Sequence, residues 1–576
     1  LLHSVPLSVY PACDYIQCWC AGKPCAMVRD KIKGETAVFR VISVLVLMLL
    51  LGGCFDKPEG PVVKTANGDV QGFVKEDVHL FYGLPYAAPP VGDLRWHAPQ
   101  PVAENWQGVR AATGVPPLCF QYMLYMQRGQ EDCLYLNIAT PSITPDKPKP
   151  VMVWFHGGGF IGGDGLQGSP LHRLAKRGDV VVVSMNYRVG ALGFMAHPTL
   201  SAESAKADGV FASGNYGLMD QQAALRWVRD NISAFGGDPQ NITIFGESAG
   251  GMSVCAHLAS PLSAGLFKQA IAQSGPCMSA NPSLHAAEKQ GEYLAIKAGC
   301  EGRGDLLACL RSKKPEEILQ ALPNDPAFVF GEEEYGYWMP VVDGRVLTDS
   351  ISNTFSSGQF NRVPVINGSN GDEGSLLVMF SHEYRFKPLV AADYEKRIHY
   401  LVGDNNTVTD KLLARYPLDK FPDPGAALSE LFGDGFMSCN VQKTSELLAQ
   451  WTPVYAYTFT YPDAKFILPE RRKLGAFHGA ELQFVFHGPM GWFENSFSGD
   501  ELKLTNAMMD YWSQFARSGK PDKPDLQPWP LFSDGGKQLI LDRQLSVSDS
   551  FKRDACTFWR ELGAGERKGL AHFEKQ

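Results

Sequence analysis

The sequence predicts an α/β protein with a large, mostly parallel central sheet, helices on both faces, and antiparallel hairpins near the N-terminus. Nearly continuous apolar runs, which are typical of strands buried on both faces, recur along the chain. Stretches with apolar residues at helical spacing separate them, as at 216–233. Strands that alternate with helices favour a parallel sheet that is covered on both sides. The apolar runs lie at 151–155, 180–183, 242–245, 270–272, 363–368 and 454–460.

Composition bounds the class of protein. The chain has 576 residues, of which 45% are hydrophobic and 20% charged, so it can bury a sizeable core. One large domain with insertions and two domains both fit this length. The net charge of -8 gives no support to a nucleic-acid partner.

The segment from 27 to 53 has the pattern of an export signal. Positive charges precede an eleven-residue apolar stretch at 41–51, which is too short to span a bilayer comfortably. The stretch closes with Leu51-Gly52-Gly53-Cys54, which resembles a bacterial lipobox, in which the cysteine is lipidated. An ordinary cleaved signal peptide and a short membrane anchor are the alternatives. We expect an exported, periplasmic or cell-envelope protein that is lipid-anchored at Cys54, with residues 54–61 as a tether.

Two further regions complete the expected organisation. Residues 1–26 are left unassigned, because no methionine precedes Met27 and their composition matches nothing downstream. Upstream sequence included by a misplaced start would explain them. Residues 62–565 are expected to form one domain, which begins with antiparallel hairpins at 68–72 and 81–86, where apolar residues alternate with turn glycines.

A strand, a tight turn and a helix follow one another around Ser248. The apolar strand ends at Phe245, the turn is Gly246-Glu247-Ser248-Ala249-Gly250, and a helix is expected from Met252 to Leu258. This order predicts a nucleophile elbow, in which the serine is strained and stands at a helix N-terminus. Glycines are needed at both flanks because a Cβ there would collide with neighbouring backbone. The alternative, that Ser248 only caps a helix, does not account for the whole pattern.

Three glycines follow the strand at 151–155, in His156-Gly157-Gly158-Gly159. Glycines after a strand leave backbone N–H groups bare and able to approach a substrate, as an oxyanion hole requires. A flexible turn is the alternative for such a run by itself. Its place upstream of a nucleophile elbow favours the oxyanion hole. His156 is expected to be a structural hydrogen-bonding residue.

A serine nucleophile needs a base and a carboxylate that orients it, and on an elbow fold the chain order is serine, acid, histidine. Asp372 and Glu373 both follow the strand at 363–368 and both qualify on chemistry. His478 lies in a glycine-containing loop, and His487 is its rival.

With these residues in place, the chain from about 61 to 562 resembles the type-B carboxylesterase and cholinesterase family of α/β-hydrolases. Both family signatures are present, at 235–250 and 131–138. The resemblance implies Glu373 as the acid and His478 as the base of Ser248. It also implies oxyanion donors at the N–H groups of Gly158, Gly159 and Ala249, and a buried polar network of Glu247, Ser274 and Glu481.

The resemblance further implies disulfides and ion pairs. The implied disulfides are Cys119–Cys133, Cys300–Cys309 and Cys439–Cys556, which leaves Cys255 and Cys277 as free, buried thiols. The implied structural ion pairs are Arg95 with Glu131 and Arg188 with Asp220.

One departure concerns substrate choice. In cholinesterases the first disulfide loop is long and carries the tryptophan that binds choline, whereas the thirteen residues between Cys119 and Cys133 contain none. We therefore expect a general carboxylesterase that hydrolyses short to medium acyl, aryl or alkyl esters through an acyl-enzyme, with a small-molecule substrate and no metal or organic cofactor. Tyr335, Tyr337, Trp338, Met339 and Phe380 are candidates to line its pocket.

Three alternatives stay open at this point. An amidase, a lactonase or a pyrethroid-type hydrolase would use the same machinery. A surface adhesion or binding protein would keep the fold without the activity, and a lipase would add a lid. The oligomeric state is open as well.

Overall fold

The computed structural model describes residues 60–563, with gaps at 104, 124–125, 167–169, 303, 323–337, 384–387, 404, 467–471 and 489–496. These residues belong to the compact unit that begins at Gly60. Residues 1–26, the expected signal at 27–53, Cys54 and most of the tether lie outside the described residues, as do Tyr335 and Tyr337.

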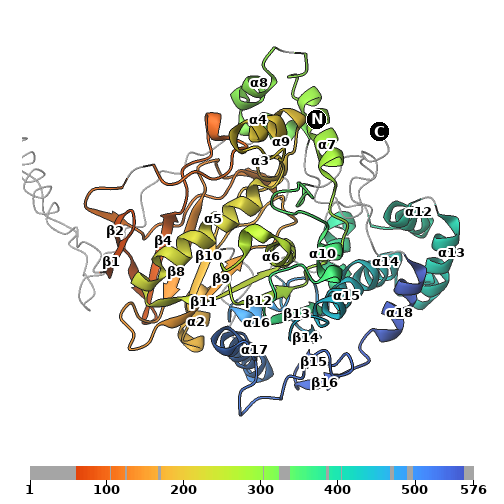
Figure 1. The fold of residues 1–576 in the computed structure, drawn as a ribbon. Coiled ribbons are helices and arrows are strands. Elements are labelled where there is room, and N and C mark those ends of the chain that lie inside the picture. Colours follow the sequence, from red (N-terminus) through yellow and green to blue (C-terminus); the bar gives the residue numbers. More distant parts are fainter. Residues whose placement is uncertain are drawn as a thin grey trace, which may run out of the picture. The chain divides into compact units, whose positions relative to one another are not determined.

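The centre of the described chain is a mixed sheet of eleven strands in the order β16-β15-β14-β13-β12-β11-β9-β10-β8-β4-β3 (Figure 1). All pairs from β10 to β15 are parallel, and the pairs toward both edges are antiparallel. The predicted fold class is therefore confirmed. The strands are β3 (Phe73–Lys75), β4 (Val78–Pro85), β8 (Tyr135–Thr140), β9 (Lys149–Phe155), β10 (Val181–Met185), β11 (Gly237–Glu247), β12 (Gln269–Gln273), β13 (Val365–Asn370), β14 (Val454–Phe459), β15 (Gln538–Leu541) and β16 (Ser546–Ser548).

Alternate side chains of the central strands enter two separate cores, one on each face of the sheet. In β9, Val151 and Val153 join one apolar cluster, and Met152 and Trp154 join the other. Both faces are buried, which is why these strands are almost continuously apolar in sequence.

Helices cover both faces (Figure 1). The first core is closed by α5 (Tyr216–Asn231), α6 (Ala249–Ala259), α10 (Ile351–Ser357) and α15 (Cys439–Leu448). The second is closed by α2 (Leu171–Gly178), α16 (Leu482–Val485) and α17 (Gly499–Ser518). A third cluster joins α11 (Glu373–Val378), α12 (Ala391–Val402), α13 (Asn406–Arg415), α14 (Pro424–Phe432) and α18 (Arg553–Leu562).

Smaller elements complete the described chain. A three-stranded sheet joins β1 (Val62–Thr65), β2 (Gly68–Gln71) and β5 (Val109–Ala111), and β6 (Gln121–Met123) pairs with β7 (Met126–Arg128). The remaining α-helices are α3 (Gly190–Phe194), α4 (Pro198–Asp208), α7 (Leu284–Lys297), α8 (Leu306–Ser312) and α9 (Pro315–Ala321). Of the helices in the described ranges, none combines the length and the apolar character that a membrane span requires.

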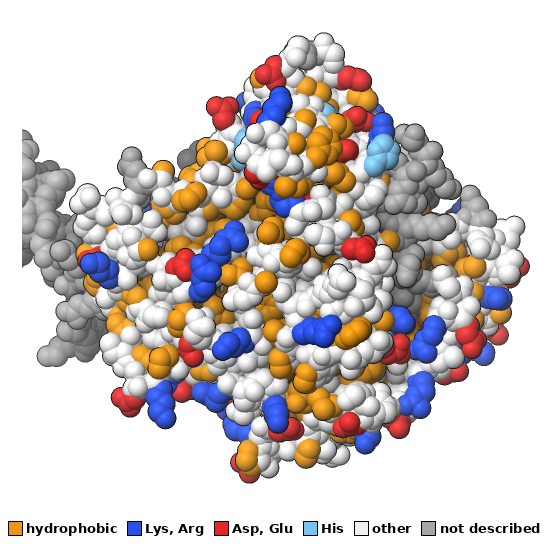
Figure 2. Space-filling model, viewed as in Figure 1, with side chains coloured by type: hydrophobic (Ala, Val, Ile, Leu, Met, Phe, Trp, Pro, Cys, Tyr) orange, Lys and Arg blue, Asp and Glu red, His pale blue; other side chains and the backbone are white. Residues whose placement is uncertain are grey.

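Charged side chains of both signs are interspersed on the face of the molecule in Figure 2. This mixture agrees with the modest net charge of the sequence. A nucleic-acid site requires cations gathered in one patch or stripe, and this face shows no such patch.

Four disulfides cross-link the described chain. Three are the pairs that the resemblance implies, Cys119–Cys133, Cys300–Cys309 and Cys439–Cys556. The fourth joins Cys255 to Cys277, so the expectation of two free thiols is wrong. Cys255 lies on α6 and Cys277 in the loop after β12, with Cα atoms 6.0 Å apart, which is within the range that a disulfide bridges.

The two implied ion pairs are present. Arg95 Nε and Nη2 each lie 2.6 Å from a Glu131 carboxylate oxygen. Arg188 Nη2 lies 2.7 Å and its Nε 2.8 Å from the Asp220 oxygens, and the two side chains are 4% and 0% exposed. Such two-pronged pairs fix the direction of the guanidinium as well as its charge.

Candidate active site

The elbow places Ser248 at a sharp turn between β11 and α6. Ser248 has φ 57° and ψ -121°, a conformation that is strained for any residue with a side chain. A Cβ on Gly250 would overlap the carbonyl oxygen of Phe155, and one on Gly246 would overlap the backbone of Gly250. Ser248 is half-buried between two buried neighbours, so the turn brings this one side chain toward the surface of the site.

Ala249 is the first residue of α6. The N–H groups of a first helical turn have no partner within the helix, and the helix dipole there favours negative charge. The N–H of Ala249 is therefore one of the groups without a partner in the helix, and it lies next to Ser248.

The glycine loop, residues 156–165, begins directly beside the elbow. β9 ends at Phe155, which pairs in parallel with Gly246 of β11. A Cβ on Gly157 would lie 3.2 Å from the Cβ of Ser248. Gly158 and Gly159 follow with φ 109° and 63°, and both are half-buried. The loop therefore passes directly beside the serine at Gly157.

His156 has a structural environment. Its carbonyl oxygen accepts a hydrogen bond from the Tyr187 hydroxyl at 2.7 Å, and its ring stacks on the Tyr187 ring at 4.2 Å. This environment agrees with the structural role that the sequence predicts for it.

Glu373 and His478 are joined by a short hydrogen bond. His478 Nδ1 lies 2.6 Å from Glu373 Oε2, and the second carboxylate oxygen accepts the backbone N–H of Asn370 at 2.8 Å. Glu373 is fully buried. A carboxylate held at Nδ1 leaves Nε2 as the ring atom that can accept a proton from a nucleophile.

Asp372 and His487, the alternatives for the acid and the base, make other contacts. Asp372 is exposed, and its carboxylate accepts the backbone N–H of Ala476 at 2.8 Å. The ring of His487 stacks on Phe497 at 5.8 Å, and its carbonyl oxygen accepts a hydrogen bond from Arg173. Burial and two nearby arginines lower the pKa of His487.

Glu247 faces the other ring nitrogen of His478, with its Oε1 3.3 Å from Nε2. Burial alone would lower the pKa of His478, but the carboxylates of Glu247 and Glu373 outweigh it and raise this pKa to about 10. Burial also raises the pKa of Glu247 to about 8, and the Glu481 and Glu373 carboxylates act in the same direction, against the imidazolium. The two shifts depend on each other, because a neutral Glu247 no longer stabilises the imidazolium. The pair therefore titrates as a unit.

Glu481 lies close to this group, and Ser274 directly follows β12. Glu481 is fully buried and accepts hydrogen bonds from Gln273 Nε2 at 3.0 Å and Asn370 Nδ2 at 2.6 Å. Ser274 has φ 48°, and its hydroxyl has no partner within the described residues. Burial, first of all, raises the pKa of Glu481.

Sequence reasoning missed Gln273 and Asn370, which hold this network. Gln273 also accepts a hydrogen bond from Trp512 Nε1 at 3.0 Å, so it links α17 to Glu481. Asn370 bonds Glu481 through its amide and Glu373 through its backbone. Both residues are the last of their strands, β12 and β13, and polar residues at that position would have been the signal.

Three of the residues proposed to line the pocket, Trp338, Met339 and Phe380, are described by the structure and pack in or against the hydrophobic cores. Trp338 is 2% exposed within the first core, and Met339 packs against it. Phe380 packs against the second core and contacts Phe466 edge to face. The structure assigns none of the three to a substrate pocket.

Comparison with known proteins gives a consistent result along most of the chain. Residues 59–559 match the model of the family described as "Carboxylesterase family". Fumonisin B1 esterase of Sphingopyxis macrogoltabida is 35% identical over 527 residues, which are 88% of each chain. Acetylcholinesterase of Bungarus fasciatus is 35% identical over 87% of this chain and 86% of its own.

A further relative and a solved structure agree with these. Pyrethroid hydrolase Ces2e of Rattus norvegicus is 35% identical over 87% of this chain and 89% of its own. A solved PNB esterase structure superposes with a TM-score of 0.70 at 31% identity, covering 86% of this chain and all of the other. The chain therefore belongs to the carboxylesterase family and is a serine hydrolase of carboxylic esters.

Proposed function

We propose that Ser248, His478 and Glu373 are the catalytic triad of this esterase, with the N–H groups of Gly158, Gly159 and Ala249 as its oxyanion hole. The observation that carries the proposal is the 2.6 Å bond from Glu373 to His478 beside a strained serine elbow. Glu247, Ser274 and Glu481 form the polar surroundings of the triad in this proposal.

In the proposed reaction, His478 Nε2 takes the proton of Ser248 as its oxygen attacks the ester carbonyl. The tetrahedral oxyanion is held by the three N–H groups. His478 then gives its proton to the leaving alcohol, and the acyl-enzyme remains. Water repeats the sequence, with His478 as base and then as acid, and releases the carboxylic acid.

We propose short to medium acyl, aryl or alkyl esters as the substrates. The loop closed by Cys119–Cys133 carries no tryptophan at which a choline cation could bind, which argues against a cholinesterase although an acetylcholinesterase is among the relatives. Amides, lactones and pyrethroid-type esters are alternatives on the same machinery, and one relative is a pyrethroid hydrolase.

Four disulfides are typical of an exported protein. We propose on the pattern at 27–54 that residues 27–53 are its export signal and that Cys54 anchors the protein to the cell envelope by a lipid. The tether at 54–61 and a catalytic domain at 62–565 belong to the same proposal.

The test is a rate series on p-nitrophenyl esters with acyl chains from C2 to C12, for wild type and Ser248→Ala. Ser356→Ala, at an exposed serine of α10, is the control. Activity on the short and medium esters that is lost only in Ser248→Ala supports the proposal, and the peak sizes the acyl pocket. A Ser248→Ala enzyme with wild-type rates would refute it.

A further inference from the structure

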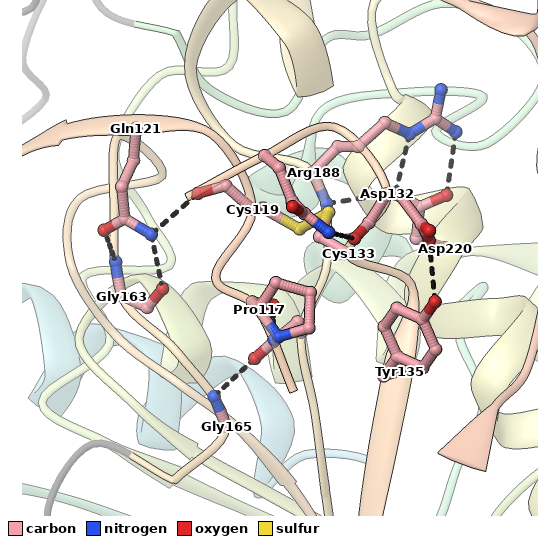
Figure 3. The surroundings of a disulfide bond; sticks show 12 residues. Pro117, Cys119, Gln121, Asp132, Cys133, Tyr135, Gly163, Gly165, Arg188 and Asp220 are labelled. Atoms are coloured by element: carbon pink, nitrogen blue, oxygen red, sulfur yellow. Dashed lines mark hydrogen bonds and ion pairs between the residues drawn. A yellow bond between two sulfur atoms is a disulfide. The ribbon is translucent and has the colours of Figure 1, made fainter. Parts of the chain in front are cut away.

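Hydrogen bonds join the glycine loop to the disulfide loop, which we define as residues 119–133. The contact lies at Gln121, a buried residue that is 3% exposed and begins β6. Its side-chain amide donates one hydrogen bond to the backbone of Gly163 and accepts another from it (Figure 3). Gly163 N donates to Gln121 Oε1 at 2.7 Å, and Gln121 Nε2 donates to Gly163 O at 2.9 Å.

The same amide also binds its own loop. Gln121 Nε2 donates a second hydrogen bond, to Cys119 O at 3.0 Å (Figure 3). Both amide hydrogens are therefore used, one toward each loop. Cys119 is held in turn by its disulfide to Cys133, so the amide is anchored on a cross-linked segment.

Gly163 transmits this contact to the start of the glycine loop. It has φ 116°, and a Cβ at this position would overlap His156 Nδ1 and the carbonyl oxygen of Gly157. Its backbone thus packs directly on the two residues that precede Gly158. Residues 158–162 form a tight turn. The N–H groups of Ile161 and Gly162 both donate to Gly158 O, at 3.1 Å and 3.2 Å.

A second amide supports the same junction. Asn186 Oδ1 accepts the N–H of Gly165 at 2.8 Å, and Asn186 Nδ2 donates to Pro117 O at 2.8 Å. Asn186 follows β10 directly, so it connects Gly165 of the glycine loop, and Pro117 just before the disulfide loop, to the sheet. The Gln121 side chain links the glycine loop and the disulfide loop directly to each other.

We propose that Gln121 is a positioning residue for the oxyanion hole. Its two-way bond to Gly163 fixes the path of the glycine loop and hence the direction of the Gly158 and Gly159 N–H groups. The inference rests on the proposed function, because it requires those N–H groups to bind the oxyanion. Loss of the bond lets the loop shift, and a misplacement of about 1 Å in a site can cost ~10²-fold in rate.

The experiment uses the full chain with Gln121→Glu and Gln121→Met. A Glu carboxylate still accepts from Gly163 N but cannot donate to Gly163 O or Cys119 O, and Met retains the length without either bond. Gln130→Glu is the matched control, since Gln130 lies in the same loop, is exposed and donates from its side-chain amide to Asp132 O, outside the glycine loop.

The measurements are kcat per active site, titrated with an organophosphate, KM for p-nitrophenyl butyrate, and Ki for an alkyl trifluoromethyl ketone, which forms an oxyanion on the serine. We expect kcat to fall about 10- to 100-fold in both Gln121 variants, which is up to the ~10²-fold cost of a misplaced group and less than the ~10²- to 10³-fold cost of a deleted oxyanion donor. KM should stay within about twofold of wild type, and Ki should rise by the same factor as kcat falls.

Either of two results would overturn the inference. One is a folded Gln121→Met enzyme with wild-type kcat per active site, even if it melts earlier. The other is a rate loss without weaker binding of the ketone. An active Ser248→Ala enzyme would instead refute the proposed function, so the two failures are distinguishable.

Discussion

Glu373 and His478 are 105 residues apart in the chain, yet their side chains meet at 2.6 Å because the residues before them, Asp372 and Phe477, form a parallel bridge. The bridge holds the two loops side by side, and this brings the Glu373 carboxylate within hydrogen-bond distance of Nδ1 of the His478 ring. The orientation of the proposed base is thus a property of backbone pairing as much as of the two side chains.

Replacing Glu373 by Gln should lower kcat by about 10³- to 10⁴-fold with little change in KM. The amide can hold the ring in the wrong tautomer and no longer stabilises the imidazolium. The measurement is kcat on p-nitrophenyl butyrate. Asp372→Asn is the control, since this neighbouring carboxylate binds a backbone N–H that an Asn oxygen can also accept. Equal losses in the two variants would contradict the assignment.

Replacing Glu247 by Gln should move the acid limb of the pH profile of kcat/KM to lower pH, by about one unit or more. The reason is that Glu247 helps to raise the pKa of His478. A base must be neutral, so activity appears as pH rises through this pKa, and a lower pKa brings activity at lower pH. Asp372→Asn should retain the wild-type midpoint. A limb that stays in place or moves to higher pH in Glu247→Gln would show that Glu247 does not act on His478.

Replacing Asp220 by Asn should lower the free energy of unfolding by about 3–5 kcal/mol, because it leaves the buried Arg188 guanidinium without its counter-charge. Urea unfolding measures the loss. Asp230→Asn removes the partner of Arg229 in an exposed pair and should cost less than about 1 kcal/mol. Similar losses in both variants would mean that burial does not set the cost.

Removing Cys439–Cys556 by a double Ala substitution should destabilise the protein more than removing Cys300–Cys309. The first bond closes a separation of 117 residues and the second one of 9. Loop-closure entropy gives about 5 and about 3 kcal/mol for the two. Urea unfolding of the two double variants tests this order, and the reverse order would show that the entropic account fails here.

The elbow, the glycine loop and the parallel sheet could be predicted because each is a local pattern of strand, glycines and helix around Ser248 or Phe155. The choice between Asp372 and Glu373 could not be made from local pattern, since it depends on which carboxylate faces the loop that carries His478. Asp372 and Glu373 stand at the start of α11, where neighbouring side chains point in different directions, and only the resemblance separated them.

The Cys255–Cys277 disulfide could not be predicted from the local sequence pattern either. Their spacing in the chain contains no information on which face of α6 carries Cys255 or how the loop after β12 returns to it. The backbones of Gly251 and Gly275 touch there, because neither has a side chain, and this approach brings the two sulfurs together. Gln273 and Asn370 were missed for a related reason, since their partners lie on other segments.

β14 is synthesised well before β15, the strand that covers its outer edge in the sheet. β14 lies between β13 and β15, but residues 460–537 separate β14 from β15 in the chain. The hydrogen bond from Thr458 of β14 to Gln538 of β15 joins residues that are 80 positions apart. The loop that carries His478 lies within that interval. Until β15 has been synthesised, the edge of β14 that β15 will cover has unpaired backbone N–H and C=O groups, which can pair with a strand of another chain. A chain released before β15 has been made would keep this edge uncovered and be prone to aggregate.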